Sequence, residues 1–127
     1  MPYTLEWLIP DRVLVGRFTG QIPLEELAQF TAEQHAAIAQ GTPPVHFIND
    51  ARQAEGMKID FKGLQGLVKA LGHAEGLGWH IDVMSGRFQR MLSAFALQLY
   101  GTRSRQFDTM EEALAFLRDN DSTLPRE

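Results

Sequence analysis

The sequence opens with two strand-like segments joined by a turn signal, and this pair constrains the fold more than any other feature. Tyr3–Ile9 and Arg12–Thr19 are rich in aromatic and β-branched residues, which favour strands. The dipeptide Pro10-Asp11 between them is typical of a tight turn, so the segments predict an antiparallel hairpin. Alternate residues share a face of a strand, and one face of this hairpin is almost wholly apolar. Its cross-strand pairs are Tyr3 with Phe18, Leu5 with Gly16, and Trp7 with Leu14.

After the hairpin, which Gly20 is expected to end, segments with helical and with strand periodicity alternate along the chain. The expected strands are Val45–Asn49, Trp79–Met84 and Ser104–Phe107. The expected helices begin near Pro23, Asp60, Arg87 and Thr109. The resulting order, β-β-α-β-α-β-α-β-α, predicts an α/β fold with a single layer of mixed, mostly parallel five-stranded sheet and four helices. The N-terminal β-hairpin supplies the antiparallel edge of that sheet.

The first expected helix runs from Pro23 to Gly41. Proline suits the first turn of a helix because its missing N–H needs no partner there, and glycine favours a helix end. Residues at helical spacing predict an inward face, and Phe30 lies off that face. The predicted inward residues are Leu24, Leu27, Ala28, Thr31, His35 and Ile38.

Length and composition set the class of protein. The 127 residues are the size of one domain, which we expect over 1–127, with an ordered core at about 3–119 and a frayed, polar C-terminal tail. The absence of cysteine excludes disulfides, thiolate zinc sites and thiol nucleophiles. A net charge of -4 disfavours a general binder of nucleic acid or anionic membranes. Because no signal-peptide pattern and no membrane-length apolar run is present, we expect a cytoplasmic location.

The element order and the C-terminal segment Phe107–Leu117, which contains the capping box Thr109-Met110-Glu111-Glu112, carry a family resemblance. The chain resembles the STAS superfamily of anti-sigma-factor antagonists over roughly residues 3–119. It is most similar to the STAS-like branch, which shares its architecture with the CRAL-TRIO lipid-binding fold. The resemblance implies a non-enzymatic binding module rather than an enzyme.

Members of that superfamily that act as phosphorylation switches carry a serine or threonine just after a strand that ends in Asp. The corresponding stretch here reads Asp50-Ala51-Arg52-Gln53-Ala54-Glu55 and contains no hydroxyl group. The usual phospho-acceptor of the family is therefore lacking, and we expect the chain to bind its partner without that switch.

Two strand ends are candidates for ligand binding, because ligands of parallel sheets usually lie beyond the carboxyl ends of the strands. One end carries Asn49, Asp50 and Arg52, and the other carries Ser85, Gly86 and Arg87. Ser85 and the free amides of a helix start suit an anion, which favours a small anionic or lipid-like ligand. Four arginines between Val83 and Phe107, with no acidic residue, support that alternative: Arg87, Arg90, Arg103 and Arg105. A capping role for Ser85 and solvated arginines explain the same pattern and stay open.

His80 and Asp82 lie two residues apart on one expected strand, so their side chains share a face. His46 is expected to join this polar face. A His–Asp pair suits general-base chemistry, but no serine or cysteine lies at a recognisable nucleophile turn. Two ligands are too few for a zinc site, and no dinucleotide or P-loop motif is present, so we expect no metal and no cofactor. An enzyme is the least favoured hypothesis.

Apolar residues outside the predicted inward faces are candidates for an interface. They are Val13, Val15, Phe30, Met57 and Phe116. Together they could form one patch, and a large apolar patch marks a partner or dimer surface. The sequence therefore favours a STAS-like interaction module that forms a homodimer or binds a protein partner.

Overall fold

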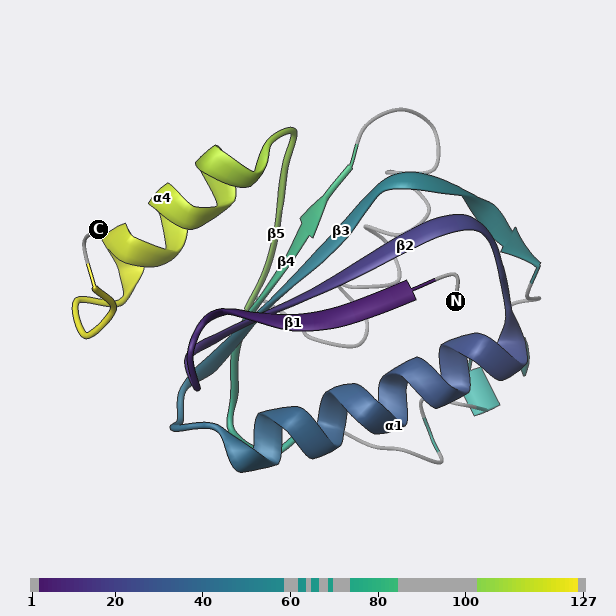
Figure 1. The fold of residues 1–127 in the computed structure, drawn as a ribbon, viewed down its shortest axis with the longest axis horizontal. Coiled ribbons are helices and arrows are strands. Elements are labelled where there is room, and N and C mark those ends of the chain that lie inside the picture. The colour runs from purple at the N-terminus through teal and green to yellow at the C-terminus, as the bar shows by residue number, and fades with distance from the viewer. Residues whose placement is uncertain are drawn as a thin grey trace.

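Five strands form one twisted sheet with a helix packed on each face (Figure 1). The computed structural model describes residues 3–58, 62–63, 65–66, 69, 74–84 and 103–125. The strands are β1 (Tyr3–Ile9), β2 (Val13–Pro23), β3 (Val45–Lys58), β4 (Leu77–Val83) and β5 (Ser104–Phe107). The described helices are α1 (Leu24–Gln40) and α4 (Met110–Asn120).

The strands lie across the sheet in sequence order, with β1 antiparallel to β2 and the remaining pairs parallel. This order confirms the predicted mixed, mostly parallel five-stranded sheet with an antiparallel edge. Only two helices, α1 and α4, are described in full, against the four expected. The helix expected from Arg87 lies outside the described residues, and so does most of the one expected from Asp60, where residues 62–63, 65–66 and 69 are helical.

The predicted hairpin register is confirmed along most of β1 and β2. It shifts at the turn, where Ile9 rather than Leu8 lies opposite Val13. The cause is a longer turn, in which Asp11 takes a left-handed φ of 64° and the Arg12 amide donates to the Ile9 carbonyl at 3.0 Å.

Strands β2 and β3 both continue past their expected ends. The structure extends β2 through Gly20 to Pro23, and β3 runs past Asp50 to Lys58. Gly20 takes φ 68°, which glycine adopts without steric cost, and still pairs with Ala54 of β3. The segment after Asp50 is polar and has the composition of a loop, but pairing with the backbone of β2 makes it a strand.

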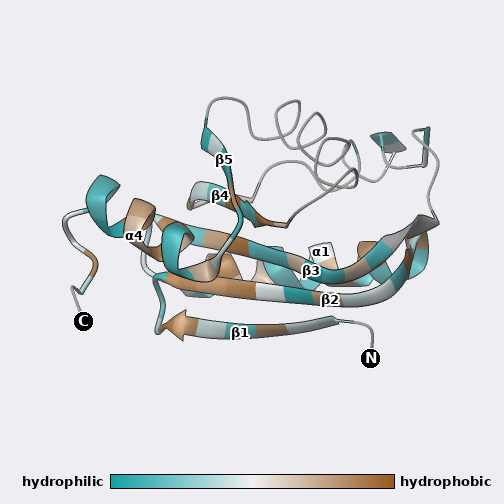
Figure 2. Ribbon diagram, turned by 90° about the horizontal axis from the view of Figure 1, so that it is seen from above, coloured by the Kyte–Doolittle hydropathy of each residue, from teal (hydrophilic) through white to brown (hydrophobic). Residues whose placement is uncertain are grey.

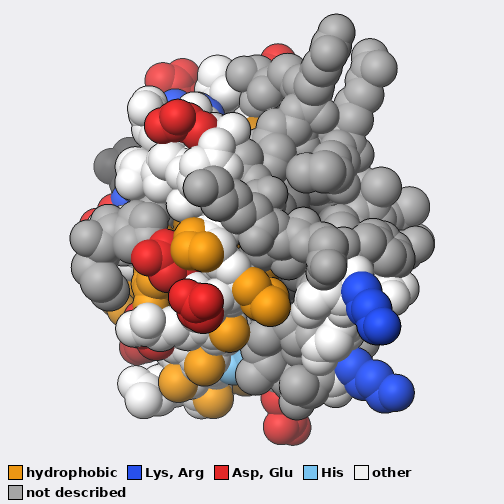
Figure 3. Space-filling view, turned by 90° about the vertical axis from the view of Figure 1, so that its right-hand side faces the viewer, with side chains coloured by type: hydrophobic (Ala, Val, Ile, Leu, Met, Phe, Trp, Pro, Cys, Tyr) orange, Lys and Arg blue, Asp and Glu red, His pale blue; other side chains and the backbone are white. Residues whose placement is uncertain are grey.

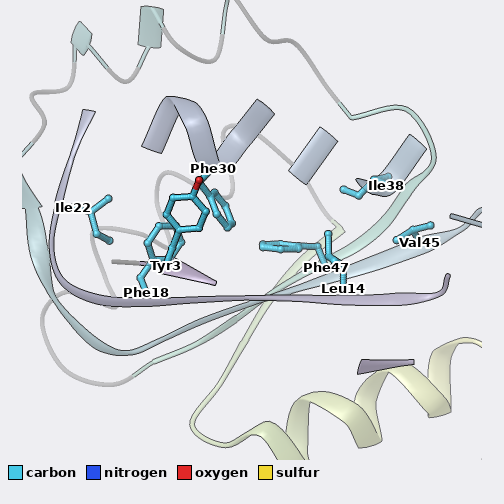
Figure 4. Packing of buried hydrophobic residues seen from close by; sticks show 8 residues of the cluster. All are labelled: Tyr3, Leu14, Phe18, Ile22, Phe30, Ile38, Val45 and Phe47. Carbon is cyan, nitrogen blue, oxygen red and sulfur yellow. The ribbon is translucent and has the colours of Figure 1, made fainter. Parts of the chain in front are cut away.

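An aromatic core lies between α1 and its face of the sheet (Figure 4). The ring of Phe30 reaches from α1 towards three aromatic rings of the sheet, with centroids 4.5 Å from Phe18, 5.3 Å from Tyr3 and 5.8 Å from Phe47. Gly16 leaves the space for this ring, since a Cβ at Gly16 would lie 2.7 Å from the Phe30 ring.

The buried face of α1 therefore matches the predicted one only in part. Ile38 is buried and Leu27 packs against the core, as expected, but the other buried residues are Phe30 and Gln34, and Leu24 is exposed. The expectation that Phe30 lies off the inward face and forms an interface is wrong. The gap above Gly16 in the sheet decides which side of the helix packs inward, and helical spacing alone does not contain that information.

A second core lies between α4 and the opposite face of the sheet. It buries Val13 and Val15 fully, so their assignment to an interface is also wrong. Phe116 is half-buried and packs edge-on against Trp79, with ring centroids 4.9 Å apart. Met57 pairs with Ile22 in the sheet, and its side chain lies outside the described residues. The buried members of this core are Val13, Val15, Ile48, Ile81, Val83, Ala113, Leu117 and Leu124.

Helix α4 begins as the capping box predicts, because the Thr109 hydroxyl accepts a hydrogen bond from the Glu112 amide at 3.1 Å. The segment after α4 is not frayed. Leu124 is buried in the second core, and Asp121 is bonded to the rest of the domain. Figure 2 shows α4 lying along one end of the sheet, with hydrophilic and hydrophobic residues alternating along β2 and β3.

Candidate functional site

The first half of β3 places two neighbouring polar residues, Asn49 and Asp50, on opposite faces of the sheet. Asn49 lies on the α1 face, as Phe47 does, and Asp50 lies on the α4 face, as Ile48 does. The structure therefore does not bring Asn49, Asp50 and Arg52 together in one ligand site. Ser85, Gly86 and Arg87 lie outside the described residues.

On the α4 face, the side chains of Asp50 and Arg52 form a bidentate salt bridge. Arg52 Nε and Nη2 donate to Asp50 Oδ1 and Oδ2 at 2.9 and 2.8 Å, and the Arg52 amide donates to Oδ1 at 3.2 Å. Arg17 Nε lies 3.4 Å from Asp50 Oδ2, and Arg17 also pairs with Glu6. We call Arg17, Asp50 and Arg52 the arginine cluster.

Neighbouring groups shift the pKa values of Asp50 and Arg52 in the arginine cluster. Burial acts to raise the pKa of Asp50, but the hydrogen bonds from Arg52 and the charges of Arg52 and Arg17 outweigh it and lower that pKa. The same contact raises the pKa of Arg52. The Asp50 side chain is 6% exposed, whereas those of Arg17 and Arg52 are 37% and 44% exposed. A buried anion thus displays two partly exposed guanidinium groups at the molecular surface.

On the α1 face, Asn49, His80 and Asp82 form a second polar group. Asn49 and Asp82 are direct neighbours in the β3–β4 register, and Asn49 Nδ2 donates to Asp82 Oδ1 at 3.1 Å. His80 Nε2 lies 3.1 Å from the same oxygen. His80 and Asp82 therefore share a face, as predicted, and Asn49 joins them. We call these three residues the buried polar cluster.

The polar row continues onto β5. Gln106 is the register partner of Asp82, and Ser104 is the partner of His80, so both share the face of the buried polar cluster. Ser104, Gln106 and Asn49 are half-buried, whereas His80 and Asp82 are buried. The opposite face of the same strands carries apolar residues that pack against α4.

Two oxygens of the buried polar cluster, Asp82 Oδ2 and Asn49 Oδ1, are buried without a hydrogen-bond donor among the described residues. Most buried polar atoms have a partner, and leaving one without a partner costs about 1–3 kcal/mol. Within the described chain His80 is the basic side chain that contacts Asp82. This arrangement is costly for a residue that serves packing alone.

His46 does not join that polar face, because it lies one residue out of phase with Phe47. It packs on the α4 face, where its Nε2 is 2.7 Å from Asp121 Oδ2. The Trp79 amide donates to Nδ1 of His46 at 3.0 Å, so Nδ1 is unprotonated and Nε2 carries the proton. Burial lowers the pKa of His46, which is consistent with a neutral ring. His46 therefore has a structural role.

Arg103 and Arg105, two of the four arginines singled out in the sequence, lie over the ring of Trp79. Their guanidinium carbons are 5.9 and 5.0 Å from its centroid. Both arginines are exposed and contact the aromatic residues between β4 and α4. Arg87 and Arg90 lie outside the described residues, so their place relative to this pair is untested.

Across the described ranges, no group of three or more histidine, aspartate or glutamate side chains is arranged to hold a metal ion. In the same part of the chain, no helix could span a membrane.

The sequence points to each member of the buried polar cluster but not to their association. Asn49 is a neighbour of Asp50 and Arg52 in the chain, which favours grouping it with them. The association depends on which residue of β3 lies beside Asp82, and the sequence of either strand alone does not determine that register. Arg17 was missed as a site residue for the same reason, since it reaches Asp50 across the β2–β3 pair.

The described residues form a five-stranded mixed sheet that opens with a hairpin, and this fold can be compared with those of known proteins. No family model and no curated protein matches the sequence. Solved structures do match. An uncharacterised DUF3478 family protein with a SpoIIAA-like fold, from Shewanella loihica PV-4, is 20% identical, with 91% of each chain covered and a TM-score of 0.64.

Two structures of SpoIIAA are similar as well. The anti-sigma factor antagonist SpoIIAA in its unphosphorylated form is 22% identical, with 91% of this chain and 97% of that chain covered and a TM-score of 0.62. The Bacillus cell fate determinant SpoIIAA in its phosphorylated form is 20% identical, with 91% and 99% covered and a TM-score of 0.57. The chain therefore has a SpoIIAA-like, STAS-like fold.

Proposed function

We propose that this chain is a non-enzymatic, single-domain binding module of the cytoplasm that recognises a protein partner through the arginine cluster. The observation that carries the proposal is the contact of Arg52 with the buried carboxylate of Asp50, on a fold that is shared with an anti-sigma factor antagonist. An arginine held in place before binding loses less conformational freedom when a partner docks.

The chemistry of the cluster defines the groups that it recognises. Asp50 occupies two N–H groups of the Arg52 side chain, and the remaining N–H groups are left to face a partner. Planar guanidinium groups favour carboxylates and backbone carbonyls, and arginine is enriched in the residues that dominate interface energies. A partner with an acidic side chain or an exposed carbonyl at this position fits the cluster.

The absence of a hydroxyl group between Asp50 and Glu55 supports binding without a phosphorylation switch at this strand. One of the similar SpoIIAA structures is the phosphorylated form. In this chain the segment after Asp50 carries Arg52, whose charge does not change at physiological pH. We infer that a partner is bound constitutively.

Self-association is the second part of the proposal. Burial of Val13, Val15 and Phe30 removes most of the apolar patch that the sequence suggested. Among the described residues, the large apolar side chains that remain exposed are Leu8 and Leu24. On the face drawn in Figure 3, the described apolar side chains lie among acidic ones. Sedimentation equilibrium over a wide concentration range tests this part, and a strict monomer overturns it.

Catalysis is not favoured. His80, the residue that an enzyme would use, is 5% exposed and stacks on Phe47 with ring centroids 5.6 Å apart. A general base needs contact with the proton that it removes, and the Nε2 of His80 faces Asp82 Oδ1 at 3.1 Å instead.

Affinity purification of the tagged full chain from its native cells, with identification of bound proteins by mass spectrometry, tests the binding proposal. We expect at least one protein to be retained by the wild type and lost with Arg52→Ala. The matched control is Arg103→Ala, which removes another exposed guanidinium, at Trp79, and leaves retention unchanged. Retention that is unaffected by Arg52→Ala, or no retention above a tag-only control, overturns the proposal.

A further inference from the structure

The face of β3, β4 and β5 opposite α4 carries a continuous row of polar side chains. Asn49, Asp82 and Gln106 lie side by side on the three strands, with His80 and Ser104 in the neighbouring row. Sheet faces inside a domain are normally apolar, as the part of the opposite face that packs against α4 is. A polar row that is half-buried at both edges and buried at its centre suits a ligand site.

At the centre of the row, the charge and the hydrogen bonds of Asp82 are incompletely matched. Its Oδ1 receives the Asn49 amide and contacts His80, but its Oδ2 is buried and has no donor among the described residues. The side chain is 2% exposed. No lysine or arginine of the described chain forms an ion pair with this carboxylate. A buried carboxylate that has no permanent cation beside it among the described residues favours a cationic ligand.

Asn49 supplies a second hydrogen-bond acceptor beside Asp82. Its amide nitrogen points to Asp82, which leaves Oδ1 as the orphan oxygen on the other branch of the side chain. The two orphan oxygens come from neighbouring strands that place Asn49 and Asp82 in register. Two acceptors on paired residues of neighbouring strands, one of them a carboxylate oxygen, match a group with several N–H donors.

We propose that the buried polar cluster binds a small organic cation through an ammonium or guanidinium group that donates to Asp82 Oδ2 and Asn49 Oδ1. The half-buried residues Asn49, Ser104 and Gln106 form the rim from which the ligand enters. This site is separate from the arginine cluster, which lies on the other face of the sheet and has the opposite charge at its surface. It also differs from the anion site that the sequence suggested, since its central group is a carboxylate.

The experiment titrates the full-length, isotope-labelled protein with methylguanidinium chloride and with methylammonium chloride at constant ionic strength, followed by NMR. Sodium chloride alone is the reference titration. We expect saturable shifts of the Asn49 side-chain amide and of the backbone amides of Asp82 and Gln106. Saturation by either cation supports the site, and the two titrations together show which cation group it prefers.

Asp82→Asn is the decisive variant, because it removes the charge and changes the shape little. We expect it to weaken cation binding at least about tenfold, as the loss of a charge-assisted hydrogen bond would. The matched control is Asp11→Asn, the same chemical change at an exposed turn, where asparagine also tolerates the left-handed φ of 64°. It leaves the affinity unchanged.

A second variant tests the site even if Asp82→Asn does not fold. Asn49→Ala removes the other acceptor at a half-buried position, and we expect it to weaken binding several-fold while the spectrum stays dispersed. If neither cation saturates the wild type, water alone satisfies the two oxygens and the proposal is overturned. Saturation with equal affinity in Asp82→Asn overturns it too, because the cation then binds elsewhere.

Discussion

His46 Nε2 lies 2.7 Å from Asp121 Oδ2, and this contact fastens the segment after α4 to the start of β3. Arg12 Nη2 donates to the same carboxylate oxygen at 2.8 Å. Burial acts to raise the pKa of Asp121, but hydrogen bonds from Thr123 and His46 and the charge of Arg12 hold it at about 2. The last segment is thereby bonded to the hairpin turn and to the centre of the sheet, and Leu124 behind it enters the second core.

The first prediction removes this contact. Asp121→Ala leaves the buried N–H of His46 and the Arg12 guanidinium without their acceptor, so we expect the free energy of unfolding to fall by about 1.5–3 kcal/mol. Urea denaturation followed by circular dichroism measures the change. The neighbouring exposed residue provides the control, and Ser122→Ala should alter the stability by less than about 0.5 kcal/mol. Equal stabilities of the two variants would contradict a structural role for the contact.

Both His46 and Asp121 are expected to make the protein less stable as the pH falls. The folded pKa of His46 is lowered from 6.5, so its contribution is present above that value and is lost as the pH falls through the folded pKa. The folded pKa of Asp121 is about 2 against 3.8, so its contribution is lost only as the pH falls from about 4 towards 2. We expect a first loss of stability just below pH 6.5 and a second in strong acid.

His46→Gln tests the first of these losses. Glutamine does not titrate, so the decline that begins just below pH 6.5 should flatten in this variant, although its stability at neutral pH is lower. Urea unfolding at a series of pH values gives the two curves. A wild-type curve that is flat between neutral pH and pH 5 would show that His46 does not titrate differently on folding.

In the arginine cluster, we expect loss of the anion Asp50 to reduce the stability more than loss of the cation Arg52. Arg52→Ala removes a side chain that is 44% exposed, and we expect it to cost less than about 1 kcal/mol. Asp50→Ala leaves Arg17 and Arg52 facing each other without the buried carboxylate, so it should cost clearly more. Chemical denaturation of both variants decides the point. A larger loss in Arg52→Ala than in Asp50→Ala would mean that the cluster is held by the arginine.

The sequence predicts local structure here better than it predicts which residues meet. Most of the hairpin register, the three later strands, the start of α4 and the order of the described elements follow from alternation and turn signals within single segments. The length of β3 does not follow, because residues after Asp50 are held in the sheet by the backbone of β2 rather than by their own preference.

In the buried polar cluster too, the local arrangement is predictable from the sequence and the contacts between strands are not. Sharing of a face by His80 and Asp82 follows from the two-residue period of one strand. Their contact with Asn49 requires the register between β3 and β4, which the whole sheet determines. Burial of Val13 and Val15 was missed because the alternation of β2 does not reveal that both of its faces are covered.

The last prediction concerns the packing of α1 on the sheet. A Cβ at Gly16 would lie 2.7 Å from the Phe30 ring and 2.9 Å from the Phe47 ring, both in the buried core, so Gly16→Ala should destabilise the fold by about 1–3 kcal/mol. Gly66 is the matched control, since it is helical and exposed, and no other part of the described chain comes within 4 Å of the place that its Cβ would take. Gly66→Ala should therefore stabilise the protein by up to about 1 kcal/mol, as alanine favours a helix. Thermal and urea unfolding of both variants give the comparison, and a neutral Gly16→Ala would show that Phe30 does not need the space above Gly16.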